Sequence, residues 1–388
     1  MNVPDYEAVA RSGVEALQRG DGATARAEFD KVVASGRASH QLWLFLAQAC
    51  EMTGDGPAME RALAPVLQHE PRNLYALLMK GEYQVRLGDD RAATSWFGLA
   101  LSSAGQQQNL ASDLIVRLQR AQETMRASEK KFEDHLCAML AAGGVDPAHT
   151  GPRFAEALEI LNGRAQPQLQ QPTSFYYPRL PQIPFYDRTG FDWVARLEAA
   201  TPAIRAEVDA VLAADQDLAP YVQPNQDRPT REHALLGDPN WSAYYLWQDG
   251  VLNAEHAKAC PATILALEGL PIPSIVTRSP MALFSVLKAK THIPPHWGML
   301  NTRLIVHLPL IVPPHCKLRV GNEVRPVEAG KVMIFDDSIE HEAWNDSDQT
   351  RVVLLFEIWR PELDAGERKA LTTMLEAINA YWSRRFNS

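Results

Sequence analysis

The spacing of apolar residues divides the chain into a helical first part and a strand-rich last part. In residues 106–142, which lack Pro and Gly, Leu110, Leu114 and Leu118 recur at helical spacing. From about residue 282 the pattern changes to short β-branched or alternating runs at 283–289, 302–310, 316–320, 331–335 and 351–359. Helical spacing resumes over 365–385. Successive short strands without intervening helices predict an antiparallel barrel or jelly roll.

A repeat of 34 residues organises the first third of the chain. The dipeptide Gly20-Asp21 recurs as Gly54-Asp55 and as Gly88-Asp89. In the same register lie small residues (Gly13, Ala47, Gly81) and larger apolar ones (Phe29, Leu63, Phe97). Residues 5–105 therefore resemble tetratricopeptide repeats, helix-turn-helix units of this length. Gly suits the left-handed end of one helix, and Asp can cap the next.

The repeats predict an all-α solenoid over residues 1–105. Solenoids of this kind present a concave surface that often binds a protein or peptide, so we expect a protein partner; a purely stabilising or self-associating role is the alternative. Residues 106–172 are expected to supply helices that cap the stack, at 106–142 and 153–162, and a Pro- and Gln-rich linker. The strand-rich domain is expected over 173–388.

Composition and charge exclude several classes of function. The formal net charge is −9 and no cluster of Lys and Arg is present, which argues against a nucleic-acid binder. No uncharged apolar run of about 18 residues exists, so no membrane span is expected. The acidic beginning of the chain does not resemble a secretory signal. Four scattered cysteines favour neither a zinc cluster nor disulfides, and indicate a cytoplasmic protein.

Histidines gather in the strand region. Five of the eleven lie between 292 and 341. His296 follows two prolines at a mouth between strands, His341 is expected in the turn after a strand, and Arg351 opens the last strong strand. Imidazole suits divalent iron, which non-haem oxygenases hold with two histidines and a carboxylate. An arginine at this place can pair with the far carboxylate of a 2-oxo acid.

The same region resembles the aspartyl/asparaginyl β-hydroxylase family. The resemblance covers about residues 173–370 and rests on HWGMLN at 296–301, FDDSIEHEAWN at 335–345, FYYPRLPQIPFYD at 175–187 and WSAYYLWQDG at 241–250. It implies a double-stranded β-helix, a jelly-roll or cupin-like barrel with flanking helices. It also implies an Fe(II)- and 2-oxoglutarate-dependent dioxygenase that consumes O2.

The resemblance assigns roles to individual residues. It makes His296 and His341 the iron ligands, and Arg351, Ser285 and His307 the groups around 2-oxoglutarate. Arg303 matches an arginine that grips the acidic side chain of the substrate in the animal enzymes. Trp247 and Gln248 are further candidates for substrate contact. Ile305 and Leu283 stand where the animal enzymes carry an arginine and a lysine, which weakens the case for aspartate as the substrate side chain.

The expected third iron ligand is missing. The residue two after His296 is Gly298, where iron oxygenases usually have Asp or Glu. Water can fill this position, which is what the resemblance implies. Alternatively Asp336, Asp337 or Glu340 reaches the metal, or chloride binds as in halogenases.

We therefore expect a hydroxylase that acts on an unactivated C–H bond. The substrate would be the β-carbon of an aspartyl or asparaginyl residue, or a related carboxylate-bearing peptide or small molecule. Hydroxylation of a lipid acyl chain is one alternative. A non-catalytic scaffold, in which the repeats bind a partner and the barrel is vestigial, is the other.

Overall fold

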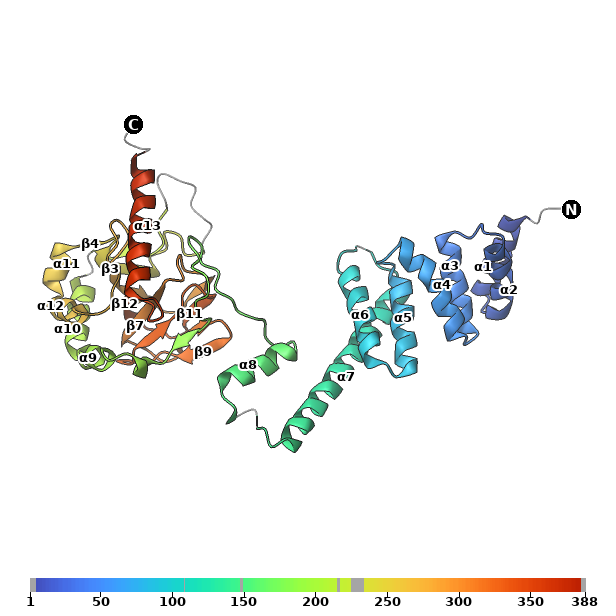
Figure 1. Ribbon diagram of the computed structural model, residues 1–388, viewed down its shortest axis with the longest axis horizontal. Helices are drawn as coiled ribbons and strands as arrows, with labels where there is room; N and C mark the ends of the chain where they lie inside the picture. Colours follow the sequence, from blue (N-terminus) through green and yellow to red (C-terminus); the bar gives the residue numbers. More distant parts are fainter. Residues whose placement is uncertain (1–4, 108, 147–148, 215–216, 225–233, 385–388) are drawn as a thin grey trace. The chain divides into compact units, whose positions relative to one another are not determined.

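The computed structural model describes residues 5–384, except 108, 147–148, 215–216 and 225–233. The chain splits into two compact units, Met1–Asn162 and Gly163–Ser388, and each is described by itself. Among the described residues, the regular elements of the first unit are helices and all strands lie in the second (Figure 1).

Unit 1 consists of three helical hairpins followed by two further helices. Their bounds are α1 (Tyr6–Gln18), α2 (Gly22–Ala34), α3 (His40–Met52), α4 (Gly56–His69), α5 (Leu74–Leu87), α6 (Asp90–Ala104), α7 (Ser112–Ala142) and α8 (Pro152–Leu161). The predicted repeat of helix, turn and helix is therefore confirmed, and the three hairpins start 34 residues apart.

The Gly-Asp turns have the conformation that the repeat predicts. Gly20, Gly54 and Gly88 have φ of +81°, +76° and +76°, which residues with a Cβ rarely adopt. Each following Asp accepts a hydrogen bond at Oδ1 from the backbone N–H three residues on, at 2.9–3.0 Å. One dipeptide thus ends a helix and starts the next.

Each hairpin closes on a pair of residues matched in size. An added Cβ at Gly13 would lie 2.5 Å from Phe29 Cε1, and one at Gly81 would lie 2.3 Å from Phe97 Cε1. Both phenylalanines are fully or almost fully buried. The middle repeat has Ala47 and Leu63 at the corresponding places, so a larger small residue accompanies a smaller apolar one. The helices approach so closely because the small residue leaves room for the ring.

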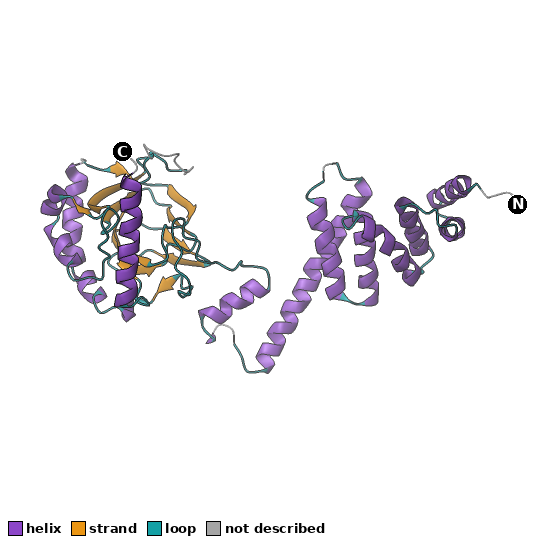
Figure 2. Cartoon of the chain, turned by 45° about the horizontal axis from the view of Figure 1, so that its top comes forward, coloured by secondary structure: helices purple, strands orange, loops and turns teal. Residues whose placement is uncertain are grey.

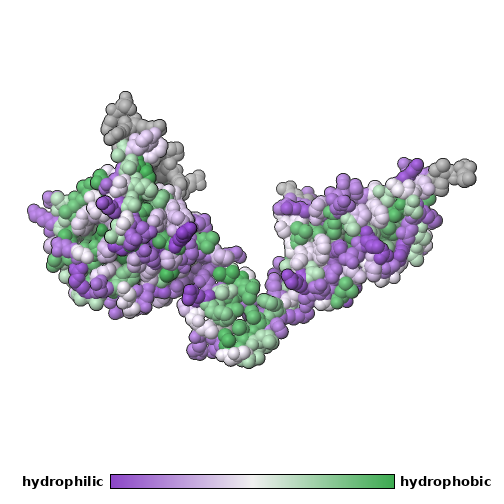
Figure 3. Space-filling view, in the orientation of Figure 1, coloured by the Kyte–Doolittle hydropathy of each residue, from purple (hydrophilic) through white to green (hydrophobic). Residues whose placement is uncertain are grey.

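Helix α7 caps the stack with its first half. Leu114, Leu118 and Ala121 are buried in one cluster with residues of α5 and α6. Further along the same helix Phe132 is 50% exposed. Helix α8 has no buried residue, and apolar side chains gather on its surface (Figure 3). The first half of α7 thus covers apolar residues of α5 and α6.

Unit 2 is built from two antiparallel sheets. The larger has the order β1-β10-β7-β12-β5-β3-β2, with β4 on β3, and the smaller has the order β6-β11-β8-β9. The strands are β1 (Phe185–Tyr186), β2 (Ala219–Pro220), β3 (Trp241–Gln248), β4 (Val251–Leu252), β5 (Ala282–Leu287), β6 (Thr291–His296), β7 (Arg303–Ile311), β8 (Cys316–Val320), β9 (Glu323–Pro326), β10 (Met333–Phe335), β11 (His341–Asn345) and β12 (Arg351–Trp359).

Two apolar layers cover the faces of the larger sheet. Even-numbered residues of β12, such as Leu354 and Phe356, pack under the helices α9 (Val194–Ala199), α10 (Thr201–Ala214), α11 (Ala254–Ala259) and α12 (Pro261–Leu267). Odd-numbered ones, such as Val353 and Leu355, face the smaller sheet. Helices lie beside the strands of this unit in Figure 2. The two facing antiparallel sheets confirm the predicted jelly-roll class.

The structure corrects the sequence-based elements in three places. His341 is the first residue of β11 and not part of a turn. His296 is the last residue of β6, a strand that its two prolines concealed; β6 is an edge strand, where proline is tolerated. The strand β3, within WSAYYLWQDG, was also not predicted.

A buried ion pair in unit 2 also binds the Pro- and Gln-rich linker through Gln170. Arg360 Nη1 donates to Asp336 Oδ2 at 2.7 Å, and both side chains are 0% exposed. Gln170 of this linker donates to the same carboxylate oxygen at 2.6 Å. Helix α13 (Ala365–Arg384) packs nearby, against Leu180, Ile275 and Leu300. Within the described ranges no helix has both the length and the apolar character that crossing a membrane requires.

The matched pairs make a prediction about stability. Gly81→Ala places a Cβ where the Phe97 ring lies, so we expect the helical unit to lose about 1–3 kcal/mol from overpacking. This exceeds the gain of about 1 kcal/mol that Ala brings to a helix interior. Chemical unfolding followed by circular dichroism measures the difference.

Gly98→Ala in α6 is the matched control. Its added Cβ would meet only Met125 Cε, at 3.9 Å, so this variant should be neutral or more stable. If Gly81→Ala proved as stable as Gly98→Ala, the close approach would not limit the repeat.

Candidate active site

A cavity of about 540 Å³ lies between the two sheets of unit 2. Its walls include His296, His307, His341, Ser285, Arg303 and Arg351, six of the eight residues that the sequence assigned to iron, co-substrate or substrate. They come from five different strands, β5, β6, β7, β11 and β12. The fold thus gathers residues that are up to 66 positions apart in the chain (351 − 285).

The two histidines lie side by side because their strands pair. His341 is the register partner of His296, and the ring centroids are 4.0 Å apart. Each Nδ1 contacts a backbone carbonyl, Pro294 O at 2.8 Å and Ile339 O at 3.1 Å. A carbonyl only accepts, so each Nδ1 carries the proton and each neutral ring has Nε2 as its unprotonated nitrogen.

Burial keeps His341 neutral. It lowers the pKa of His341 to about 4, with the charges of Arg319 and Arg303 acting in the same direction. A neutral imidazole with a fixed tautomer is the form that binds a divalent metal. The histidine pair therefore fits a metal site.

Arg351 is a buried cation with no acidic partner among the described residues. It opens β12, is 1% exposed, and its Nε has no hydrogen-bond partner among the described residues. Burial lowers its pKa to about 10. Ser285 lies one strand away, two residues along the register, and its Oγ accepts from Trp241 Nε1 at 3.1 Å. A carboxylate bound here would supply the missing negative charge.

His307, on β7, also lines the cavity. Its ring is edge-on to Phe335 at 4.9 Å. Burial lowers its pKa well below the usual value, and the charge of Arg351 adds to this effect. His307 is therefore a neutral polar group in the wall of the cavity, beside the unpaired arginine.

The polar and apolar residues form tiers along the strands that face the cavity. Arg303, Ile305 and His307 alternate on β7 with residues of the opposite face. On β12, Leu355 pairs with His307 on one side and with Leu283 on the other. The register therefore places charged groups at the Arg303 end, an apolar tier in the middle, and Ser285 and Arg351 at the far end.

The carboxylate of Asp337 occupies the space of a side chain at residue 298. An added Cβ at Gly298 would lie 2.1 Å from Asp337 Oδ2 and 2.2 Å from its Cγ. The backbone N–H of Gly298 donates to Asp337 O at 2.6 Å, which holds the two segments together. Gly298 is thus required by packing, because the Asp337 carboxylate lies where any side chain of residue 298 would have to begin.

The other two acids proposed as ligands have partners elsewhere. Asp336 belongs to the buried pair with Arg360, and Glu340 accepts from Arg319 Nη2 at 2.8 Å. In the described part of the chain no group of three His, Cys, Asp or Glu residues is arranged to hold a metal. Two imidazoles are therefore the ligand set that the cavity offers.

Unsatisfied buried polar atoms concentrate in this cavity. Among the described residues seven buried side-chain atoms have no hydrogen-bond partner, and four belong to cavity residues: Trp297 Nε1, Arg303 Nε, Asp337 Oδ1 and Arg351 Nε. Such atoms are rare in folded proteins and mark places where a ligand or ion completes the structure. Their common location supports a binding site.

Two predicted residues are not brought to the cavity. Trp247 packs against the core under the helices, on the other side of the larger sheet, and Gln248 is exposed at the end of β3. Conversely, the cavity is lined by Trp241, Tyr221 and Arg278, which sequence reasoning did not single out. The alternation of aromatic residues in 241–247 was a signal for Trp241, but Arg278 lies in a turn without a motif.

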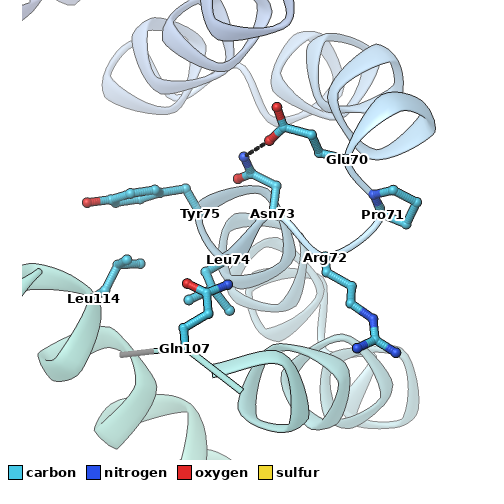
Figure 4. Close-up of a pocket in the computed structure, with 8 residues that line it drawn as sticks. All are labelled: Glu70, Pro71, Arg72, Asn73, Leu74, Tyr75, Gln107 and Leu114. Atoms are coloured by element: carbon cyan, nitrogen blue, oxygen red, sulfur yellow. Dashed lines mark hydrogen bonds between the residues drawn. The ribbon is translucent and has the colours of Figure 1, made fainter. Parts of the chain in front are cut away.

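Unit 1 has a hollow of its own. It is lined by residues 70–75, Gln107 and Leu114 (Figure 4). Its polar side chains pair with neighbours: Asn73 Nδ2 donates to Glu70 at 2.7 Å, and Tyr75 Oη donates to Asp113 at 2.9 Å. Among the described residues, no side chain that lines this hollow has a buried polar atom without a hydrogen-bond partner, in contrast to the cavity of unit 2.

Comparison with known proteins identifies relatives of unit 2. Residues 198–361 match the family described as Aspartyl/Asparaginyl beta-hydroxylase. The chain is 40% identical over 188 residues to the ornithine lipid ester-linked acyl 2-hydroxylase of Rhizobium tropici, and 38% identical over 185 residues to the human aspartyl/asparaginyl beta-hydroxylase. These alignments cover 48% and 47% of this chain.

The chain spans only part of these relatives. The alignments cover 63% of the Rhizobium protein and 23% of the human one. Among solved structures, PcrH from Pseudomonas aeruginosa is 17% identical with a TM-score of 0.28, covering 33% of this chain and 95% of PcrH. A predicted oxalate decarboxylase from Thermotoga maritima is 12% identical with a TM-score of 0.21, covering 31% and 81%. Both scores are low, so the fold rests on the strand registers described above.

The contact between Gly298 and Asp337 predicts a coupled pair of substitutions. Gly298→Ala forces a Cβ against the Asp337 carboxylate, so we expect unit 2 to lose about 1–3 kcal/mol. In an Asp337→Gly background the obstructing atoms are gone, and the same substitution should cost much less. Unfolding of the four proteins, wild type included, measures the coupling as a double-mutant cycle. Additive effects would show that the two residues do not compete for one space.

Proposed function

We propose that unit 2, whose residues 198–361 match the aspartyl/asparaginyl β-hydroxylase family, is an Fe(II)- and 2-oxoglutarate-dependent hydroxylase. The observation that carries the proposal is the presence, within one cavity, of two adjacent histidines whose Nδ1 atoms contact backbone carbonyls and of a buried arginine with no acidic partner among the described residues. The histidines suit iron, and the arginine suits the far carboxylate of a 2-oxo acid. When bound, iron(II), 2-oxoglutarate and O2 supply the oxidising power to hydroxylate an unactivated C–H bond.

The side chains of the cavity hold and orient these groups. His296 and His341 would bind the metal through Nε2, because Nδ1 of each ring is engaged by the backbone. Arg351 would bind the distal carboxylate in a low-dielectric environment, where a charged hydrogen bond is strong, and the Ser285 hydroxyl would assist. His307 would lie beside the end that chelates iron.

The substrate class has two candidates. Aspartyl or asparaginyl residues are suggested by the family description and the human relative, and an acyl chain by the Rhizobium relative. In either case we propose a substrate that carries a carboxylate or a similar anion, as a peptide, a protein segment or a small molecule. The vestigial scaffold is disfavoured because the cavity retains both histidines and the unpaired arginine.

The repeats and the cysteines bear on the cellular context. We propose that unit 1 binds a protein or peptide partner, which is a common use of a helical solenoid. All four cysteines are free thiols and three are buried. Free thiols suit a reducing compartment, so we keep the proposal of a cytoplasmic protein.

Metal and co-substrate binding test the hydroxylase proposal. Anaerobic titration with Fe(II) and 2-oxoglutarate should produce a metal-to-ligand charge-transfer band in the wild type. His341→Ala removes one of two protein ligands and should abolish the band. His292→Ala is the control, because His292 stacks on Trp344 and is not part of the cavity wall. A wild-type protein that binds iron but forms no band with 2-oxoglutarate would contradict the proposal.

The role of Arg351 has a separate test. Arg351→Met keeps the length of the side chain and removes its charge, so we expect 2-oxoglutarate to bind about 10–100-fold more weakly at saturating Fe(II). The same titration measures this value. Arg325→Met, at an exposed arginine outside the cavity, should leave it unchanged. An unchanged affinity in Arg351→Met would remove this arginine from the co-substrate site.

A further inference from the structure

The protein already neutralises Arg303. Its Nη1 donates to Glu357 and its Nη2 donates to Asp337 Oδ2 at 3.2 Å. Ser279 Oγ also donates to Glu357, at 2.5 Å. Burial disfavours the charge, but the two carboxylates together raise the pKa of Arg303. The two acidic side chains already occupy the guanidinium, which disfavours the approach of a further carboxylate.

Arg278 differs from Arg303 in this respect. It lines the same cavity and is partly buried. Among the residues with a described position, none forms an ion pair or a side-chain hydrogen bond with its guanidinium. Burial lowers the pKa of Arg278, the charge of Arg303 lowers it further, and the charges of Glu357 and Asp249 oppose this only in part. An anion bound beside Arg278 would offset both unfavourable effects.

The turn that carries Arg278 is held in place. Ile275 and Ser279 bridge it with backbone hydrogen bonds. Helix α13 supports it from outside, since Val276 N–H donates to Glu376 Oε1 at 3.1 Å and Asn379 Nδ2 donates to Thr277 Oγ1 at 3.0 Å. The arginine therefore projects from a fixed backbone. This favours binding, because the backbone loses little conformational entropy when a ligand binds.

An uncharged surface separates Arg278 from the co-substrate end. Arg278 precedes β5 by four residues, on the side where Arg303 and Glu357 lie. Next along the sheet come Ile305 on β7 and Leu355 on β12, which line the cavity before Ser285 and Arg351 are reached. A charged group on these apolar side chains would lose its hydration without a partner.

We propose that Arg278, and not Arg303, binds the anionic group of the acceptor substrate, and that an uncharged aliphatic segment reaches the histidine pair across Ile305 and Leu355. The inference rests on the proposed hydroxylase and specifies its substrate class: an acyl or alkyl chain joined to a carboxylate. An aspartyl side chain would instead bring its charge onto the apolar tier. The part of the substrate that is oxidised is therefore the uncharged segment.

A matched pair of probes tests this assignment. N-octanoylglycine and N-octanoylglycinamide share a chain and differ only in charge. Isothermal titration of the full chain with Mn(II) and 2-oxoglutarate measures their binding without turnover. We expect the carboxylate to bind more tightly than the amide, and Arg278→Gln to weaken only the carboxylate, by about tenfold or more, which equals about 1.4 kcal/mol.

Two further variants and one peptide separate the alternatives. Lys288→Gln removes an exposed cation just after β5 and should change neither affinity. Arg303→Lys keeps a charge for its two carboxylates and should leave the preference for N-octanoylglycine intact. A short peptide with a central aspartate should bind more weakly than N-octanoylglycine.

Two outcomes would overturn the inference. One is an unchanged preference for the carboxylate in Arg278→Gln. The other is tight binding of the aspartyl peptide that is lost in Arg303→Lys. Neither affects the charge-transfer band of Fe(II) and 2-oxoglutarate, so failure of this inference and failure of the proposed hydroxylase are distinguishable.

Discussion

The burial of β12 on both faces is the constraint on which unit 2 depends. All nine residues of this strand are buried, with alternate side chains under the helices and in the cavity. The helix side is purely apolar, so the sheet is stabilised there by hydrophobic packing. The cavity side carries Arg351 and Glu357 into the interior. A slip of one residue would move these charges into the apolar layer, so the register of the central strand is strongly specified.

The arginines of unit 2 differ in whether a carboxylate of the described residues pairs with them. Arg303 and Arg360 have carboxylate partners within the protein, and these ion pairs connect segments that are distant in sequence. Arg351 and Arg278 are not matched by a carboxylate among the described residues. The ion pairs fix the shape of the cavity, and the two unmatched cations are the places where we propose that anions bind.

Much of this organisation follows from local sequence, and the rest depends on neighbours in space. Runs such as 316–320 and 351–359 predicted their strands to the residue, because alternation and β-branching are local signals. The same rules missed β6, because an edge strand tolerates proline. They also missed the short β11, whose pairing partners lie elsewhere in the sequence. The six cavity residues were found through motifs. Motifs did not reveal the packing of Asp337 against Gly298 or its ion pair with Arg303, because Asp337 lies on another segment of the chain.

The matched pairs of unit 1 limit how its repeats can be exchanged. Glycine faces phenylalanine in the first and third hairpins, and the second has alanine and leucine at these places. Recombination that moves a whole hairpin keeps each pair intact. A crossover at the Gly-Asp turn between the two helices would instead join alanine to phenylalanine, or glycine to leucine, and leave either a clash or a void. The complete hairpin is therefore the smallest segment that can be exchanged between repeats without disturbing this contact. The Gly-Asp turns alone are similar enough to allow exchange of single helices.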